Sequence, residues 1–141
     1  MANITGWERE KRIHFDEIVA TYDIIRPEYP SELFLDVIEY ANPQNGKKAI
    51  EIGAGTGKAT TPFLAAGYSV TAIDISKNMA AFLLERFKGY ENLNVIIASF
   101  EDALLEENSY DLVYAASAFH WVDAEIRCPK ALRLLKSRGS I

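Results

Sequence analysis

From Lys47 onward, short apolar runs alternate with segments of helical periodicity, and this alternation constrains the fold more than any other feature of the chain. The runs have the length of buried strands, and the segments between them repeat apolar residues at helical spacing. We expect strands over 48–52, 69–74, 94–98 and 111–115, and helices over 58–66, 77–87 and 129–136. Strands and helices in alternation predict an α/β domain with a mainly parallel sheet.

The predicted elements have clear end signals. Gly67 and Gly89 stand just past two of the helices, where a left-handed residue often ends a helix, and Ser76 stands just before a helix as an N-cap. Because these signals agree with the change of period, the alternation is a consistent pattern and not an accident of composition.

Residues 1–45 predict a helical segment ahead of the sheet. A first helix carries Phe15, Ile18, Val19 and Tyr22 on one face. The prolines within 26–30 end it, because each proline disfavours a helical conformation in the residue before it. A second helix follows, with Ser31 as its expected N-cap. Its predicted buried residues are Leu33, Phe34, Val37 and Ile38.

Composition limits the class of protein and its partners. A chain of 141 residues with 49% hydrophobic content predicts a single domain over 1–141, with a core large enough to fold without disulfides or a structural metal. A net charge of −5 argues against nucleic acid as a partner. One cysteine, Cys128, excludes an internal disulfide, and two histidines are too few for the usual zinc sites. No apolar run approaches the roughly 18 residues of a membrane helix, so we expect a cytoplasmic protein with no membrane contact and no metal.

The loop between the first strand and its helix excludes one ligand class and disfavours another. Gly53 and the Gly57–Lys58 pair enclose three residues, whereas a Walker A loop needs four, and Ala59 stands where the magnesium ligand Ser or Thr belongs. The dinucleotide fingerprint expects a third glycine at the position of Lys58. An NAD-dependent oxidoreductase is therefore a weaker alternative.

The pattern Glu-x-Gly-x-Gly-x-Gly at residues 51–57 resembles the class I S-adenosylmethionine-dependent methyltransferases. The resemblance implies a Rossmann-like doubly wound fold, S-adenosyl-L-methionine as the cofactor, and transfer of its methyl group to a small-molecule acceptor. A glycine loop suits this cofactor, because the backbone can approach the amino-acid end closely while amides near the helix start face its carboxylate. Residues 1–45 would then form a cap, and residues 46–141 the cofactor-binding half.

The resemblance assigns cofactor contacts to matching positions. Glu51 would balance the cofactor's amine, since a carboxylate buried inside a strand is costly without a cationic partner. Asp74 ends the second strand about 20 residues after the loop, where doubly wound folds place an acid on ribose hydroxyls. Ile75 would pack on adenine, with Ser99, Phe100 or Glu101 from the end of the third strand. The other candidates are Gly53, Ala54, Gly55, Gly57, Met79 and Ala116.

Two further segments resemble the methyltransferase type 11 group. Residues 110–122 match its fourth strand and following loop, and His120 is the candidate general base because histidine is the side chain that ordinarily exchanges a proton near neutral pH and because it stands in the loop. The alternative is a histidine stacked between Phe119 and Trp121. Tyr22 and Arg26 would close over the methionine end, Arg26 as a carboxylate partner; a buried apolar role for Tyr22 and a surface ion pair for Arg26 are the alternatives.

The end of the chain departs from the resembling enzymes. There, the last helix leads through a Pro-Gly-Gly turn into a fifth strand and then the rest of a seven-stranded sheet, whereas here residues 135–139 replace that turn and two residues follow. We therefore expect a sheet truncated after its fourth strand and the following helix, with that strand at or near an exposed edge. Homodimer formation would cover such an edge. A cofactor-binding or interaction module without turnover is the alternative to an active enzyme.

Overall fold

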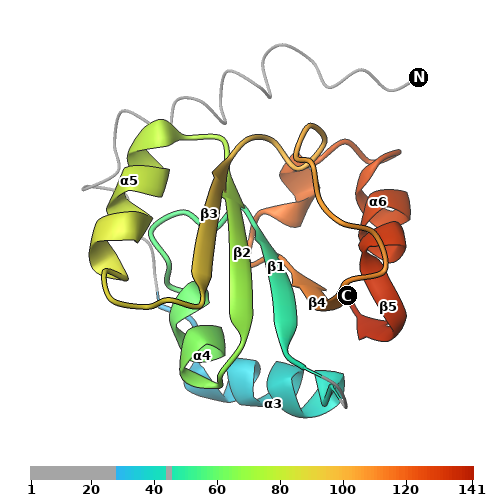
Figure 1. Ribbon diagram of the computed structural model, residues 1–141, viewed down its shortest axis with the longest axis horizontal. Coiled ribbons are helices and arrows are strands. Elements are labelled where there is room, and N and C mark those ends of the chain that lie inside the picture. The colour runs from blue at the N-terminus through green and yellow to red at the C-terminus, as the bar shows by residue number, and fades with distance from the viewer. Residues whose placement is uncertain (1–27, 44–45) are drawn as a thin grey trace.

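The computed structural model describes residues 28–43 and 46–141 (Figure 1). Within these residues, five parallel strands form one sheet in the order β3-β2-β1-β4-β5. The strands are β1 (Lys48–Ile52), β2 (Ser69–Asp74), β3 (Leu93–Ile97), β4 (Tyr110–Tyr114) and β5 (Leu135–Ser140). The helices are α3 (Ser31–Ala41), α4 (Thr60–Ala65), α5 (Lys77–Arg86), the short 3-10 helix η2 (Phe119–Trp121) and α6 (Arg127–Leu134). The predicted α/β domain with a parallel sheet is confirmed.

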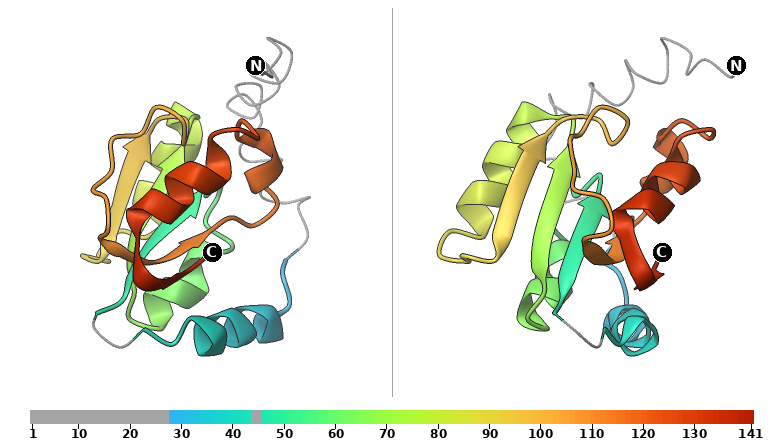
Figure 2. Two further views of the ribbon diagram at one scale, coloured as in Figure 1. Left: turned by 90° about the vertical axis from the view of Figure 1, so that its right-hand side faces the viewer. Right: turned by 45° about the vertical axis from the view of Figure 1, so that its right-hand side comes forward.

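Both faces of the sheet are covered, so the central strand β1 is buried from Ala49 to Ile52 (Figure 2). Helices α3, α4 and α5 pack on one face, where Phe63 and Leu83 meet Ala49 of β1. Helix α6 and the segment after β3 pack on the other face, where Leu134 and Phe100 meet the isoleucines of β1. Strand β1, at the centre of the sheet, is therefore buried between two hydrophobic cores, one on each face.

The strand order places a crevice at the carboxyl end of β1. The chain runs from β1 outward to β2 and β3, and then returns to the other side of β1 for β4 and β5. The loops that leave β1 and β4 therefore diverge above opposite faces. In doubly wound sheets, ligands bind at such a switch point, outside the carboxyl ends of the strands.

The predicted end signals of the helices are confirmed for α4 and α5. The Ser76 side chain accepts a hydrogen bond from the amide of Met79 at 3.1 Å, so it caps α5. Gly67 and Gly89 have φ of +88° and +99°, the left-handed conformation expected just past a helix.

Helix α3 differs from its prediction at its start and on its buried side. Ser31 is the first helical residue after Pro30, and no side chain caps the helix. Leu33 is 47% exposed, whereas Phe34 is 8% exposed. The cause is tertiary, because α3 contacts α4 through the Phe34 and Phe63 rings, whose centroids lie 6.0 Å apart.

The chain does not stop at four strands: residues 135–140 form β5. They pair parallel to β4, with Tyr110 opposite Leu135 and Leu112 opposite Ser140. The prediction of a sheet ending at its fourth strand is therefore wrong, and β4 has a neighbour on each side. Asp111 of β4 joins three strands, because its buried carboxylate accepts hydrogen bonds from the Lys48 amide at 2.9 Å and from Lys136 Nζ at 3.2 Å.

Helix α6 begins and ends two residues earlier than expected. It spans Arg127–Leu134, so Pro129 lies in its first turn, where the missing amide proton is not needed. Ala131 and Leu134 are its buried residues, and Leu132 is 63% exposed. The predicted first helix, with Tyr22 and Arg26, lies outside the described residues. Among the residues that are described, no helix has the length and apolar character of a membrane span.

Candidate functional site

The glycine loop after β1 is held in a shape that L side chains rarely adopt. Gly53, Gly55 and Gly57 have φ of +66°, +58° and +90°. The Gly53 amide donates to the carbonyl of Ile73 at 2.8 Å, which ties the loop to β2. A Cβ on Gly53 would lie 2.6 Å from the Cβ of Ala118, so the loop passes directly against the segment that follows β4.

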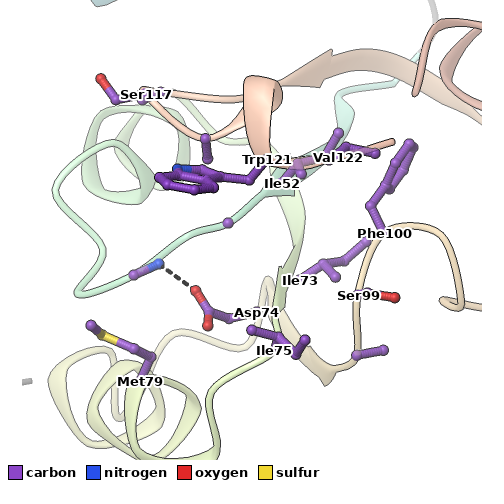
Figure 3. A pocket seen from close by; sticks show the side chains of 15 residues that line it. Ile52, Ile73, Asp74, Ile75, Met79, Ser99, Phe100, Ser117, Trp121 and Val122 are labelled. Atoms are coloured by element: carbon purple, nitrogen blue, oxygen red, sulfur yellow. Dashed lines mark hydrogen bonds between the residues drawn. The ribbon is translucent and has the colours of Figure 1, made fainter. Parts of the chain in front are cut away.

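A cavity opens between this loop, the end of β2 and the segments after β3 and β4 (Figure 3). We call it the large cavity, because it is the larger of the two cavities that the glycine loop borders. It is lined by Ile52, Gly53, Gly55, Ile73, Asp74, Ile75, Met79, Ala98, Ser99, Phe100, Ala116, Ser117, Ala118, Trp121 and Val122. Figure 3 shows the Trp121 ring on one side of this space, with Asp74 and Met79 across from it. Such a lining suits a ligand that carries a flat apolar ring next to a polar group.

Asp74 is the acid of the large cavity. Its Oδ2 accepts a hydrogen bond from the Gly55 amide at 2.9 Å, drawn dashed in Figure 3, and its Oδ1 accepts one from the Ser76 amide at 2.9 Å. These two bonds fix the carboxylate at the end of β2. A carboxylate offers about four acceptor positions, so such a group can accept from backbone amides and from ligand hydroxyls together.

A smaller and more polar cavity adjoins the large one, and we call it the small cavity. It shares Gly53, Gly55 and Ala116 with the large cavity, so the two lie side by side. Its other lining residues are Tyr29, Glu51, Ala54, Thr56, Lys58 and Ala59. The glycine loop is therefore a wall of both cavities.

Glu51 is the buried acid of the small cavity. Its side chain is 1% exposed, and the Thr60 hydroxyl donates to it at 2.6 Å. Burial raises the pKa of Glu51 from 4.5 to about 7, and the nearby charge of Asp74 adds to the rise, while hydrogen bonds from Thr60 and Tyr114 oppose it. These partners are neutral hydroxyl groups, and their hydrogen bonds offset only part of the effect of burial. The pKa of Glu51 therefore stays close to neutral pH.

Tyr29 and Lys58 complete the small cavity. The Lys58 side chain is 9% exposed, and its Nζ lies 3.7 Å from Glu28 Oε1. The Tyr29 hydroxyl donates to Ser117 Oγ at 3.0 Å, which connects the start of α3 to the segment after β4. Ser117 has φ of +58°, an uncommon conformation for a non-glycine residue that is often seen at functional sites.

The structure brings most of the predicted site residues together. Those that line the two cavities are Glu51, Gly53, Ala54, Gly55, Asp74, Ile75, Met79, Ser99, Phe100 and Ala116. Tyr22 and Arg26 lie outside the described residues.

Three predicted residues lie outside both linings. Gly57 faces α5, since a Cβ there would lie 2.5 Å from the Phe87 ring. The Glu101 side chain accepts from the Asp123 amide at 2.9 Å and so connects the loops after β3 and η2. His120 is exposed, with its ring centroid 4.8 Å from that of Trp121. Successive residues of a 3-10 helix point about 120° apart, so with Trp121 facing the cavity, His120 faces elsewhere.

Sequence reasoning missed eleven lining residues, and the five that matter most here are Tyr29, Lys58, Ser117, Trp121 and Val122. Trp121 and Val122 belong to the segment that was singled out, but a pattern of adjacent aromatic residues does not say which one faces inward. Tyr29 lies among the prolines after the predicted first helix. Lys58 was used only to argue against a Walker A loop and a dinucleotide fingerprint, although its place at the end of the glycine loop is the signal that could have found it.

Comparisons with known proteins agree with this geometry. A family model described as a methyltransferase domain matches residues 50–141. The chain is 31% identical over 138 residues to the uncharacterized methyltransferase Rv3342 of Mycobacterium tuberculosis, a match that covers 98% of this chain and 54% of that protein. The chain thus spans about half the length of the curated relatives it matches.

Two solved structures share the fold. Phosphoethanolamine N-methyltransferase 2 of Haemonchus contortus, solved with phosphomonomethylethanolamine and S-adenosylhomocysteine, is similar with a TM-score of 0.73 and 21% identity, over 92% of this chain and 32% of its own. The [4+2]-cyclase SpnF is similar with a TM-score of 0.75 and 16% identity, over 92% of this chain and 57% of its own. Since one fold serves a methyltransferase and a cyclase, the fold alone does not define the reaction.

The family is decided by the sequence match and not by the fold. The family model covers well over half of the chain, and the match to the mycobacterial relative runs through nearly all of it. The glycine loop after β1 and the acid at the end of β2 stand where the resemblance requires them. The chain therefore belongs to the class I S-adenosylmethionine-dependent methyltransferases.

Proposed function

We propose that this chain binds S-adenosylmethionine across the two adjoining cavities and transfers its methyl group to a small-molecule acceptor. One observation carries the proposal: the Gly55 amide, on the wall that an apolar and a polar cavity share, holds the Asp74 carboxylate of the apolar cavity at 2.9 Å. The cofactor has the same division, with adenosine at one end and a charged amino acid at the other.

The large cavity fits the adenosine end. Asp74 would accept hydrogen bonds from the two ribose hydroxyls, because its oxygens are held in place at the cavity and a carboxylate accepts several hydrogen bonds. Ile75 and Met79 supply apolar surface next to it, and Phe100 and Trp121 supply aromatic surface for the adenine ring. Gly53 and Gly55 suit a closely approaching ligand, since neither presents a side chain to it.

The small cavity fits the amino-acid end. A cationic amine beside Glu51 would favour the ionised carboxylate, which burial otherwise disfavours. Lys58 lines the same cavity and supplies positive charge for the ligand carboxylate. Arg26 and Tyr22 are proposed from the sequence to close this end.

The residues around the methyl group would align the reactants and exclude water. When bound, S-adenosylmethionine supplies a methyl group already activated by a sulfonium. The protein therefore acts by holding the reactants in position. Correct orientation of two reactants can lower the activation barrier by several kcal/mol. Ser117 and Trp121 come from the segment after β4 and border the large cavity. His120 adjoins Trp121 on the exposed side of η2, and it is the proposed base for an acceptor that binds on that side and must lose a proton.

The acceptor is proposed to be a small molecule in the cytoplasm. A net charge of −5 opposes binding to the phosphate backbone of a nucleic acid. The cavities are lined by a mixture of apolar and polar groups, as expected for a small organic ligand.

Calorimetric titration tests the proposed cofactor site. We expect adenosylhomocysteine to bind the protein and NADH not to bind. Asp74→Asn should weaken adenosylhomocysteine binding by about tenfold, because one charged acceptor of the ribose is lost. Asp36→Asn, which neutralises an exposed carboxylate on α3, is the matched control and should bind like the wild type. Binding of NADH alone, or equal affinity in the two variants, would contradict the proposal.

The second part of the proposal is self-association through a sheet edge, and the edge is no longer the fourth strand that the sequence suggested. Because β5 covers β4, the edges of the described sheet are β3 and β5. Strand β3 is the more apolar edge, and its Ile97 is 53% exposed, whereas β5 carries Lys136 and Arg138. Charged residues discourage edge pairing, so a homodimer would form through β3.

A further inference from the structure

Lys130 of α6 makes an unusual set of contacts with the segment that follows β3. Its Nζ donates to the backbone carbonyls of Phe100 at 2.6 Å, Ala103 at 2.7 Å and Glu101 at 3.2 Å. An ammonium group has three protons, so each of them has a carbonyl acceptor. The same Nζ lies 5.1 Å from the centroid of the Phe100 ring. One cation thus contacts both the backbone and a side chain of this segment.

The segment it contacts is a tight turn over residues 99–103. The Asp102 amide donates to Ser99 Oγ at 3.2 Å, and the Ala103 amide donates to the Ser99 carbonyl at 2.9 Å. The turn directs the carbonyls of Phe100, Glu101 and Ala103 toward one point, which is occupied by Lys130 Nζ. Converging carbonyl dipoles repel one another and need a donor when partly buried. Lys130 is that donor, in the manner of a cation at the end of a helix.

The first two residues of this turn line the large cavity. Ser99 and Phe100 both border it, while Phe100 is 2% exposed and packs in the core beneath α6. Figure 3 shows both on the same side of the cavity as Ile73. The shape of the turn therefore sets the position of this wall.

We propose that Lys130 is a positioning residue for cofactor binding: its ammonium group holds the turn of residues 99–103 so that Ser99 and Phe100 form one wall of the large cavity. This inference rests on the proposed binding of S-adenosylmethionine in that cavity. Lys130 itself is not among the residues that line either cavity, so it acts through the turn and not by touching the ligand.

The test compares two lysines that make polar contacts at opposite ends of the sheet. Lys130→Met removes the ammonium group and keeps most of the side-chain volume. Lys136→Met is the matched control, because Lys136 pairs with buried Asp111 at 3.2 Å near the amino end of β4, away from both cavities. A merely structural role would make the two variants alike, with lower stability and unchanged ligand affinity.

We expect calorimetric titration with adenosylhomocysteine to show about tenfold weaker binding to Lys130→Met than to the wild type, as for loss of charge-assisted hydrogen bonds. Lys136→Met should keep the wild-type affinity. Hydrogen exchange, read without any ligand, should show faster exchange of the Asp102 and Ala103 amides in Lys130→Met alone. Lys130→Arg should lie between, since a planar guanidinium cannot direct donors at three convergent carbonyls.

The outcomes separate this inference from the proposed function. A wild-type protein that does not bind adenosylhomocysteine overturns the proposed function, and the inference with it. A wild type that binds, with Lys130→Met of equal affinity, overturns the inference alone. Should Lys130→Met fail to fold, Lys130→Arg decides, and wild-type affinity with wild-type exchange in that variant overturns the inference.

Discussion

Glu51 is an acid buried in the central strand, and its environment makes the stability of the protein depend on pH. The side chain is 1% exposed, and burial raises its pKa from 4.5 to about 7. Between these two values the folded state holds a proton that the unfolded state has released. Rising pH therefore favours unfolding over this window. The stabilising contribution is fully present below about 4.5 and is lost as the pH rises through about 7.

Glu51→Gln should remove this pH dependence. The shift from 4.5 to about 7 corresponds to about 3 kcal/mol, so the free energy of unfolding of the wild type should fall by up to that amount relative to the variant as the pH rises through the window. Urea unfolding of both proteins at several pH values provides the measurement. Parallel curves for the two proteins would show that Glu51 is ionised in the folded state throughout.

Trp121 and His120 are adjacent, yet only Trp121 lines the large cavity. Trp121→Ala should weaken adenosylhomocysteine binding by about tenfold, because an aromatic wall is lost. His120→Ala is the matched control and should bind the ligand normally, as expected for an exposed side chain. Calorimetric titration provides both values. The opposite order of affinities would mean that the segment after β4 turns its other side to the ligand.

His120→Ala has a separate expected effect on turnover. If His120 is the base for the acceptor, the variant should lose turnover while its cofactor affinity is preserved. Initial rates with an acceptor that the wild type methylates would measure this. Unchanged turnover would remove His120 from the mechanism.

At the scale of elements, the glycine loop and α5 are fitted to each other through Gly57. Its φ is +90°, and a Cβ there would lie 2.5 Å from Phe87 and 2.9 Å from Leu83. The sequence pattern assigned all three loop glycines to the cofactor. The structure shows that the last one lets the loop pack on the end of α5.

Gly57→Ala should therefore cost more than the left-handed conformation alone explains. The conformation costs about 1–2 kcal/mol, and the clash with α5 adds about 1–3 kcal/mol. Gly67→Ala is the matched control, because Gly67 has φ of +88° with nothing within 4 Å of the added Cβ. Urea denaturation should show a loss for Gly57→Ala of about twice that for Gly67→Ala or more. Equal losses would show that the Phe87 ring moves aside freely.

At the scale of the whole molecule, the open strand at each side of the described sheet bears on self-association. For pairing through β3, light scattering of a dilute solution should give about twice the chain mass of 15.8 kDa. Ile97→Lys should return the mass to that of one chain, because a charged residue on an edge strand opposes pairing. A wild-type mass of one chain would exclude this dimer.

The sequence could predict the elements whose signals are local. Apolar runs bounded by glycines gave the positions of β1 and β2, and Ser76 gave the start of α5. The predicted bounds of β3 and β4 were each one residue too late. The apolar run of a strand can be recognised in the sequence, but the hydrogen bonds that define its first and last residues cannot. In the site, the Glu-x-Gly-x-Gly-x-Gly pattern and Asp74 were recognisable because their spacing is itself the signal.

Elements that depend on distant contacts could not be predicted in this way. Strand β5 has a polar sequence with no alternation, and it is a strand because α6 delivers Leu135 to β4 and Lys136 meets Asp111. Likewise, Leu33 and Phe34 are equally apolar, and only the position of Phe63 decides which of them is buried.

By itself, then, the sequence determined the parallel α/β sheet, the glycine loop and the acid that follows it, and through them the family. The tertiary structure alone decided that β5 completes the described sheet, that Trp121 and not His120 faces the cavity, and that Lys130 contacts the turn after β3. The physical reason is range. Periodicity and end signals act between neighbours along the chain, whereas a strand partner, an inward rotation or a shared cation depends on groups that folding brings together from afar.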